Sequence, residues 1–218
     1  MATQIPLDFK IKPDFSADAF IVAPCNKAAH GIVLAGNWPN QCLSMIGPKG
    51  AGKTHLGHVW AENMNALILY GKTTLEPDTQ WKDQHIWLDN ADKASELTLF
   101  ALINMAISGE IKSVLFTSRF LPDAWPVNLP DLQSRLKNLT IAPLDDPDDE
   151  VLGGILAKLF MDRGLVVSES VIDYLLFHAD RSVEALSRLV HDIDQAAASS
   201  KSNVTRPFVA RFLQNQLL

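Results

Sequence analysis

Short apolar runs alternate with longer amphipathic segments along the first two thirds of the chain. The apolar runs predict strands at 41–46, 66–70, 85–88, 113–117 and 139–142. Segments 53–63 and 94–107 between them can form helices. Alternation of this kind is typical of a parallel sheet covered by helices. The order of strand, glycine-rich loop and helix at 41–63 is also the order that a phosphate-binding loop requires.

The pattern changes after Pro147. Strand signals stop, and three or four amphipathic segments predict helices at 149–163, 168–179, 182–199 and 205–217. Ser168 is a plausible helix N-cap, and Pro207 lies near a helix start, where its missing N–H costs least. A cluster of carboxylates around Pro147 indicates a polar hinge leading into a first helical turn: Asp145, Asp146, Asp148, Asp149 and Glu150. We therefore expect an extended arm at 1–12, an α/β domain at 13–146 and a small all-helical domain at 147–218.

Composition narrows the class of protein. The chain has 218 residues, of which 47% are hydrophobic and 20% charged, as expected for a globular protein. No apolar run approaches the roughly 20 residues of a bilayer span, and no secretory signal is visible, so we expect a cytoplasmic protein with no membrane contact. A net charge of −6 argues against a broad basic face for nucleic acid. Cys25 and Cys42 have no metal-type spacing and predict buried thiols.

The strongest motif follows the first predicted strand. It fits the pattern GxxxxGK[ST] with the residues Gly47, Pro48, Lys49, Gly50, Ala51, Gly52, Lys53 and Thr54. Glycines let the backbone N–H groups converge on phosphate oxygens, and the helix that follows adds its positive end. Lys53 would meet the β and γ phosphates, and the Thr54 hydroxyl would hold Mg²⁺.

Three weaker signals surround this loop. Asp89 ends an apolar strand and is a candidate metal-side carboxylate, although a helix cap is an alternative. Its neighbour Asn90 stands where a P-loop enzyme that hydrolyses its nucleotide usually carries an acid. The run 117–119, Thr-Ser-Arg, could sense the γ-phosphate or could form a simple turn. Arg135 could project from a subunit edge toward a partner's phosphate, with a surface ion pair as the alternative.

Several segments, taken in order, resemble the DnaA family and its Hda-like branch. They are FIVAPCN at 20–26, GPKGAGKTHL at 47–56, LDN at 88–90, SVLFTS at 113–118, LPDLQSRL at 129–136 and DRGLVVSESVIDYLL at 162–176. The resemblance implies an AAA+ core with a helical lid, ADP or ATP with Mg²⁺ as cofactors, and Arg135 as an arginine finger acting in trans. It implies a metal site at Thr54 and Asp89. The implied nucleotide-contacting residues are Phe20, Ile21, Val22, Gly47, Lys49, Gly50, Ala51, Gly52, Lys53, Thr54, His55 and Arg181.

The amino terminus resembles the short peptide with which bacterial proteins dock onto the β sliding clamp of DNA polymerase III. Its candidate contacts are Gln4, Ile5, Leu7 and Phe9. An extended peptide can place the leucine and phenylalanine in an apolar pocket, and Pro6 lowers the entropy lost on binding. The resemblance thus implies the clamp and DnaA as partners, and DNA only indirectly through the clamp. A homo-oligomer stays open.

Two departures from the family pattern lower the expected ATPase activity of the chain itself. Asn90 cannot take a proton, and Glu184 stands where DnaA carries its lid arginine. Arg181 or Arg188 could replace that arginine. We expect weak or no self-hydrolysis and an activator of the DnaA ATPase. The alternative is an autonomous AAA+ ATPase or a helicase loader of the DnaC-like kind.

Overall fold

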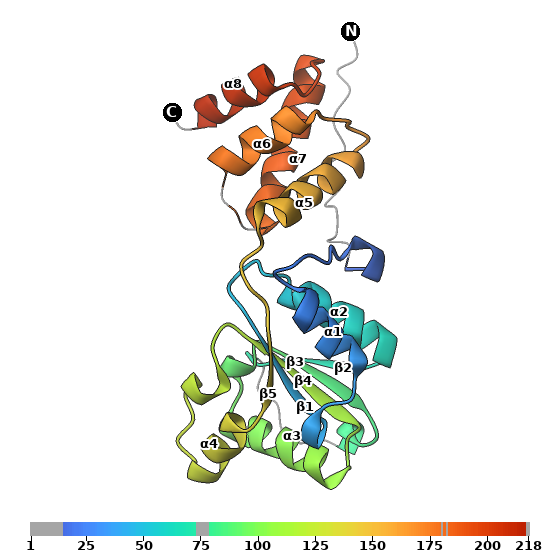
Figure 1. Cartoon of the computed structure of the whole chain (residues 1–218), viewed down its shortest axis with the longest axis vertical. Helices are drawn as coiled ribbons and strands as arrows, with labels where there is room; N and C mark the ends of the chain where they lie inside the picture. The colour runs from blue at the N-terminus through green and yellow to red at the C-terminus, as the bar shows by residue number, and fades with distance from the viewer. Residues whose placement is uncertain (1–14, 73–78, 180, 182, 217–218) are drawn as a thin grey trace.

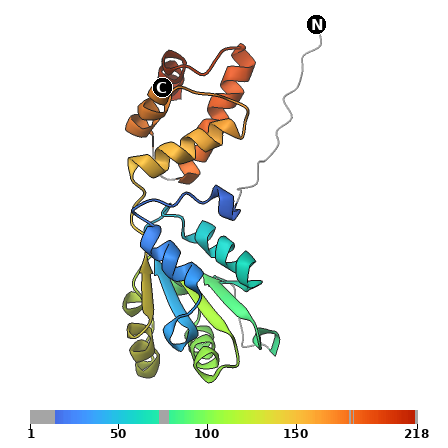
Figure 2. The ribbon, with the colours of Figure 1, turned by 45° about the vertical axis from the view of Figure 1, so that its right-hand side comes forward.

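The computed structural model describes residues 15–72, 79–179, 181 and 183–216, in two stacked parts (Figure 1). The lower part is an α/β core, and the upper part is a bundle of helices. A single crossing links them where the last strand of the core leads up into the first helix of the lid (Figures 1 and 2). The predicted parallel α/β core with a helical lid is therefore confirmed.

One parallel sheet organises the described core. Its strands are β1 (Cys42–Ile46), β2 (Leu67–Tyr70), β3 (His85–Asp89), β4 (Ser113–Ser118) and β5 (Thr140–Pro143). They lie in the order β2-β3-β4-β1-β5, so that β1, β3 and β4 occupy the middle. Because all strands run in one direction, the residues that follow β1, β3 and β4 meet at one edge of the sheet.

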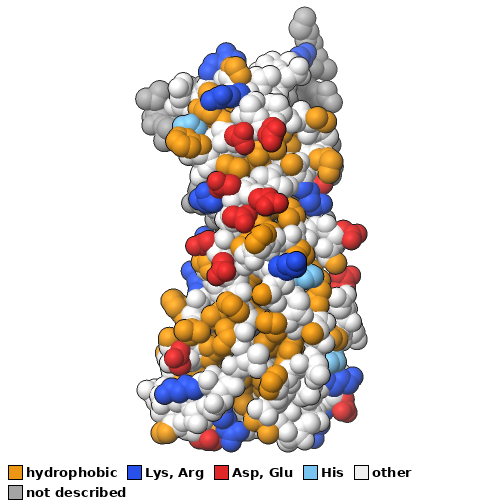
Figure 3. Space-filling model, viewed as in Figure 1, with side chains coloured by type: hydrophobic (Ala, Val, Ile, Leu, Met, Phe, Trp, Pro, Cys, Tyr) orange, Lys and Arg blue, Asp and Glu red, His pale blue; other side chains and the backbone are white. Residues whose placement is uncertain are grey.

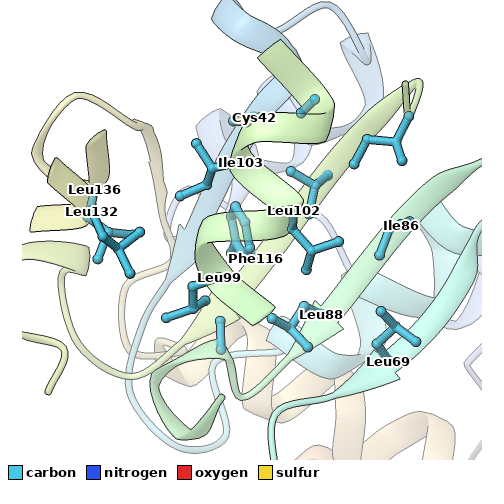
Figure 4. Close-up of a cluster of buried hydrophobic side chains, with 14 of the residues drawn as sticks. Cys42, Leu69, Ile86, Leu88, Leu99, Leu102, Ile103, Phe116, Leu132 and Leu136 are labelled. Atoms are coloured by element: carbon cyan, nitrogen blue, oxygen red, sulfur yellow. The ribbon is translucent and has the colours of Figure 1, made fainter. Parts of the chain in front are cut away.

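Helices cover both faces of the sheet. The face with α1 (Lys27–Ala35) and α2 (Lys53–Met64) buries Leu43, Met45, Trp87 and Leu115 of the strands. The face with α3 (Glu96–Ser108) and α4 (Pro130–Lys137) buries the alternate strand residues, among them Ile86, Leu88 and Phe116 (Figure 4). Both sides of each central strand are apolar, which explains the unbroken apolar runs in the sequence. Short 3₁₀ turns lie at Ala17–Ala19, Pro39–Gln41, Thr79–Trp81, Ala91–Lys93 and Pro122–Ala124.

The lid has its own apolar core. It contains α5 (Asp149–Met161), α6 (Glu169–His178), α7 (Val183–Ser200) and α8 (Arg206–Gln216), packed around residues such as Leu156, Phe160 and Val190. The carboxylate cluster leads into α5 as predicted, because Asp148 accepts a hydrogen bond from the backbone N–H of Val151 at 2.9 Å. Acidic side chains gather at this level of the surface (Figure 3).

Two local predictions are confirmed. Pro207 is the second residue of α8, as expected from its sequence position. Ser168 occupies the N-cap position of α6, where its hydroxyl bonds the Ser170 hydroxyl at 2.9 Å rather than a backbone N–H. None of the described helices is long and apolar enough to cross a bilayer.

Candidate functional site

The glycine-rich loop joins the carboxyl end of β1 to α2, at the top of the core beside the lid (Figure 1). Gly50 and Gly52 have φ angles of 89° and 91°, which side chains other than glycine rarely adopt. Gly52 is also the residue before α2 begins. The loop therefore curls into the start of the helix, where unpaired N–H groups and the helix dipole favour an anion.

The Lys53 ammonium is held over this loop. Its Nζ donates to the backbone carbonyls of Gly47 and Pro48, each at 2.6 Å. Burial lowers the pKa of Lys53, and the charge of Arg119 lowers it further, whereas Asp89 and Asp92 act in the opposite direction. Lys53 thus lies in a partly buried region where cations and carboxylates are close enough to influence one another.

A chain of hydrogen bonds fixes Asp89, the carboxylate predicted to lie on the metal side. Asp89 is 8% exposed, and its Oδ1 accepts from the Thr117 hydroxyl at 2.6 Å. The Trp87 indole in turn donates to the Thr117 oxygen at 3.2 Å. Asn90 donates from its amide to Asp89 Oδ2 at 3.0 Å and has a φ of 54°, which asparagine tolerates better than most residues. The hydroxyl of Thr117 is therefore used to hold Asp89, and Asp89 caps no helix here.

Thr54 and Asp89 are chemically suited to a magnesium ion. Mg²⁺ prefers oxygen ligands and commonly takes only one or two from the protein, with waters and phosphate oxygens completing the set. Thr54 is exposed in the first turn of α2, and Asp89 ends β3 at the same edge of the sheet. The described residues contain no cluster of three or more His, Cys, Asp or Glu that would form a separate metal site.

Residues 20–22 lie between the loop and the lid. A Cβ atom built on Gly52 would lie 3.4 Å from the Phe20 ring, and one built on Gly154 of α5 would lie 3.1 Å from the end of Ile21. Val22 is 46% exposed. Asn26 holds the turn, since its amide donates to the Ile21 carbonyl at 2.8 Å and its oxygen accepts from a backbone N–H. This segment is placed where a base next to the loop would meet apolar side chains.

Two histidines of α2 hold the chain that enters the core. The imidazole Nε2 of His55 lies 2.9 Å from the carbonyl of Ser16, and the ring of His58 stacks on Phe15 with a centroid distance of 4.4 Å. The other side of His58 meets Trp87 edge to face at 4.9 Å. Burial lowers the pKa of His58, with a smaller lowering from His55 and an opposing effect of Asp89. His55 therefore contacts the entering chain, a role that the loop motif does not indicate.

Arg181, the candidate for the lid arginine, is paired with groups at the start of α5. Arg181 pairs with Asp149 at 2.7 Å and donates to the Pro147 carbonyl at 3.4 Å, so it ties the start of α7 to the start of α5. Arg188 is exposed on α7. The side chain of Glu184 lies outside the described residues. A nucleotide contact by Arg181 thus stays a prediction.

Arg135 is not brought to the loop. It lies in the last turn of α4, at the end of the core away from the lid (Figure 1). Its Nε donates to Asp131 at 3.1 Å, and its guanidinium lies 5.4 Å from the centre of the Phe100 ring. The clamp-peptide residues Gln4, Ile5, Leu7 and Phe9 fall outside the described residues.

The lid matches a known family of domains. Residues 152–213, which run from α5 through most of α8, match the family model described as Hda, lid domain. The fold of the chain is that of the AAA+ proteins: domain III of the Thermotoga maritima replication initiation protein DnaA superposes with a TM-score of 0.75 at 18% identity, covering 95% of this chain and 98% of that one.

Two further proteins are similar to the chain. A DnaA bound to AMPPCP and single-stranded DNA has a TM-score of 0.66 at 17% identity, over 88% of this chain and 70% of that one. An uncharacterized protein of Haemophilus influenzae is 27% identical over 183 residues, which are 77% of this chain and 79% of that protein. The structural likenesses establish the fold.

Sequence reasoning missed two residues of this candidate site. Asp92 is 6% exposed and close enough to Lys53 to raise its pKa, yet it resembles any acid in a turn. Its place three residues after Asp89 is the only signal that could have found it. Asn26 was noted only as part of a motif, and its buried amide turned out to hold residues 20–22.

Proposed function

We propose that this protein is a nucleotide-bound regulator of replication initiation. It docks on the β sliding clamp through residues 4–9 and promotes hydrolysis of the ATP bound to DnaA. Arg135 acts as the arginine finger in trans, and the protein's own ADP or ATP, held with Mg²⁺, maintains the active arrangement. The site of action is the cytoplasmic replisome.

The position of Arg135 relative to the loop carries this proposal. Helix α4 leads into β5, whose first residue, Thr140, pairs with Leu43 near the start of β1. The loop follows the opposite end of β1. The strand residues between these two ends span about 13 Å at roughly 3.3 Å per residue. A finger on α4 is therefore suited to a nucleotide on another molecule.

The surface around Arg135 suits a protein partner. The carboxylate of Glu96 accepts a hydrogen bond from the backbone N–H of Asn128, which brings their exposed neighbours Leu97 and Leu129 to one region. These leucines are 59% and 47% exposed, and Arg135 lies on α4 beside them, over Phe100. Exposed apolar groups around an arginine are common at protein interfaces.

The contacts of Asn90 favour a stable bound nucleotide. Its amide donates to Asp89, and a neutral amide has no basic group with which to activate water. Asp89 remains available to the metal through its other lone pairs. We therefore expect the chain to hold nucleotide for long periods and to hydrolyse it slowly.

The decisive experiment measures ATP hydrolysis by DnaA with DNA-loaded clamp, with and without this protein. Arg135→Ala should abolish the stimulation, because removing an arginine finger lowers phosphoryl-transfer rates by about 10³ to 10⁵. Lys137→Ala, on the same helix, is the matched control and should stimulate normally. Arg135→Ala should keep its nucleotide and clamp affinity and its melting temperature.

Two outcomes would contradict the proposal. Normal stimulation by Arg135→Ala would remove the finger from the mechanism, and rapid hydrolysis by the protein alone would favour the autonomous ATPase. The clamp contact is tested separately by replacing Gln4, Leu7 and Phe9 with alanine. Unchanged co-elution of that variant with the clamp would show that residues 4–9 are not the clamp-binding peptide.

A further inference from the structure

We propose that Arg119 is a phosphate-binding residue of the nucleotide site, supplying from the core the positive charge that Glu184 cannot supply from the lid. This inference rests on the proposed nucleotide binding. Arg119 contacts the phosphates beyond the first, so the site binds ADP and ATP more tightly than AMP.

The sheet register brings Arg119 to the loop. Ser118, the last residue of β4, pairs with Ile46, the last residue of β1. The next residues along the two strands are Arg119 and Gly47, so the arginine leaves the sheet beside the first glycine of the loop. Neighbouring strands lie about 4.8 Å apart, well within the length of an arginine side chain.

The backbone around Arg119 is fixed on both sides. The Ser118 hydroxyl donates to the Phe120 carbonyl and accepts from the Phe120 N–H at 3.3 Å. The indole of Trp125, only 5% exposed, donates to the same hydroxyl at 3.2 Å and to the Phe120 carbonyl at 3.1 Å. The turn that presents Arg119 is therefore preorganised, which lowers the entropy lost when the side chain binds a ligand.

The charges around Arg119 leave it available. It is exposed, and within the described part of the chain it forms no hydrogen bond or ion pair. Lys53 is bonded to the carbonyl of Gly47, the residue beside which Arg119 leaves the sheet, so a phosphate group that contacts both cations would be attracted by each.

The lid offers a weaker source of the same charge. The guanidinium of Arg181 is taken up by Asp149 and the Pro147 carbonyl, so it must break an ion pair before it can reach a nucleotide. Arg119 needs no such step and no movement of the lid. A core arginine therefore explains how the site could hold nucleotide with a glutamate at position 184.

The test uses the full-length protein with Mg²⁺ and isothermal titration calorimetry against AMP, ADP and ATP. Arg119→Ala should weaken ADP and ATP binding by about 10- to 100-fold, the range for hydrogen bonds to charged groups. AMP affinity should change little. Arg119→Lys should recover part of the loss, and Arg211→Ala, an exposed arginine on α8, serves as the matched control.

The outcomes separate this proposal from the wider function. Unchanged ADP and ATP affinity in Arg119→Ala, with DnaA stimulation intact, would overturn the Arg119 assignment alone. An equal loss for AMP would also overturn it, because the contact would then not lie on the outer phosphates. If the wild-type protein binds neither ADP nor ATP, both proposals fail. Melting curves without nucleotide check that each variant is folded, and Arg119→Lys provides the test if Arg119→Ala is not.

Discussion

The two ends of the core differ in how firmly they hold their charged side chains. At the loop end, Asp89 is buried and held by Thr117 and Asn90, and Lys53 is bonded to its own loop. At the other end, Arg135 lies over the Phe100 ring and pairs with Asp131, whose side chain is 62% exposed. A surface pair of this kind contributes about 0–1 kcal/mol. The first end is preorganised for a ligand of its own, whereas the second can release its arginine at little cost.

The largest expected effects come from one variant at each end of the core, because each variant should remove a different property. Lys53→Ala should abolish the rise in melting temperature that saturating ADP causes, a rise that corresponds to about 2.7 kcal/mol at 100 times the Kd. Arg135→Ala should keep this rise and lose the stimulation of DnaA by about 10³-fold or more. Thermal melts with and without ADP, beside the hydrolysis assay, check both. If Arg135→Ala also loses the ADP response, the two ends are not independent.

The next effect concerns the rigidity of the loop end. Thr117→Val keeps the shape of the side chain but removes the hydroxyl that bonds Asp89 and accepts from Trp87. Buried groups that lose a partner cost about 1–3 kcal/mol each, so urea unfolding should show a destabilisation of that size. Ser134→Ala on α4 is the control and should change the free energy of unfolding by less than about 0.5 kcal/mol. Equal effects of the two variants would show that the loop end is held no more firmly than the end that carries α4.

A smaller effect depends on pH. Burial lowers the pKa of His58 below its ordinary 6.5. Below about pH 6.5 the unfolded chain therefore binds a proton that the folded protein does not bind, and stability falls as pH falls until the folded pKa is reached. Because His58 is partly exposed, we expect this contribution to be smaller than that of a fully buried histidine.

The matching variant isolates that contribution. His58→Phe keeps a ring between Phe15 and Trp87 and should reduce the loss of unfolding free energy between pH 7.5 and 5. Some loss should persist, because burial and Lys112 also lower the pKa of His85. Urea titrations at both pH values measure the difference. A variant with the full wild-type pH dependence would show that His58 contributes nothing.

The smallest effect is expected at the end of the core that carries Arg135. Asp131→Ala removes the ion pair of Arg135 and should lower the free energy of unfolding by less than about 1 kcal/mol. Stimulation of DnaA should persist, because the Phe100 ring still supports the guanidinium. A loss of stimulation comparable to that of Arg135→Ala would mean that Asp131 orients the Arg135 side chain. The end of the core that carries Arg135 would then be as preorganised as the loop end.

Local patterns were sufficient for most of the fold. Each predicted strand and helix appears within one or two residues, because the apolar runs of a doubly covered sheet and the amphipathic lid helices differ strongly in period. The loop motif was equally readable, since Gly52 needs its positive φ and Lys53 follows it directly. The N-cap position of Ser168 was also predicted, although its hydroxyl bonds Ser170, a choice among nearby partners that the sequence does not rank.

The sequence by itself determined the parallel core, the helical lid and the glycine-rich loop between the first strand and the helix that follows it, because these follow from short-range spacing and backbone restrictions. Only the tertiary structure decided that Arg119 emerges beside Gly47, that Arg181 is held by Asp149, and that Arg135 lies at the far end of the core. The close approach of Gly57 to Trp87 is of the same kind, since a Cβ there would lie 2.3 Å from the indole. Such relations join residues distant in the chain, and they depend on strand order, register and helix packing, which no local pattern specifies.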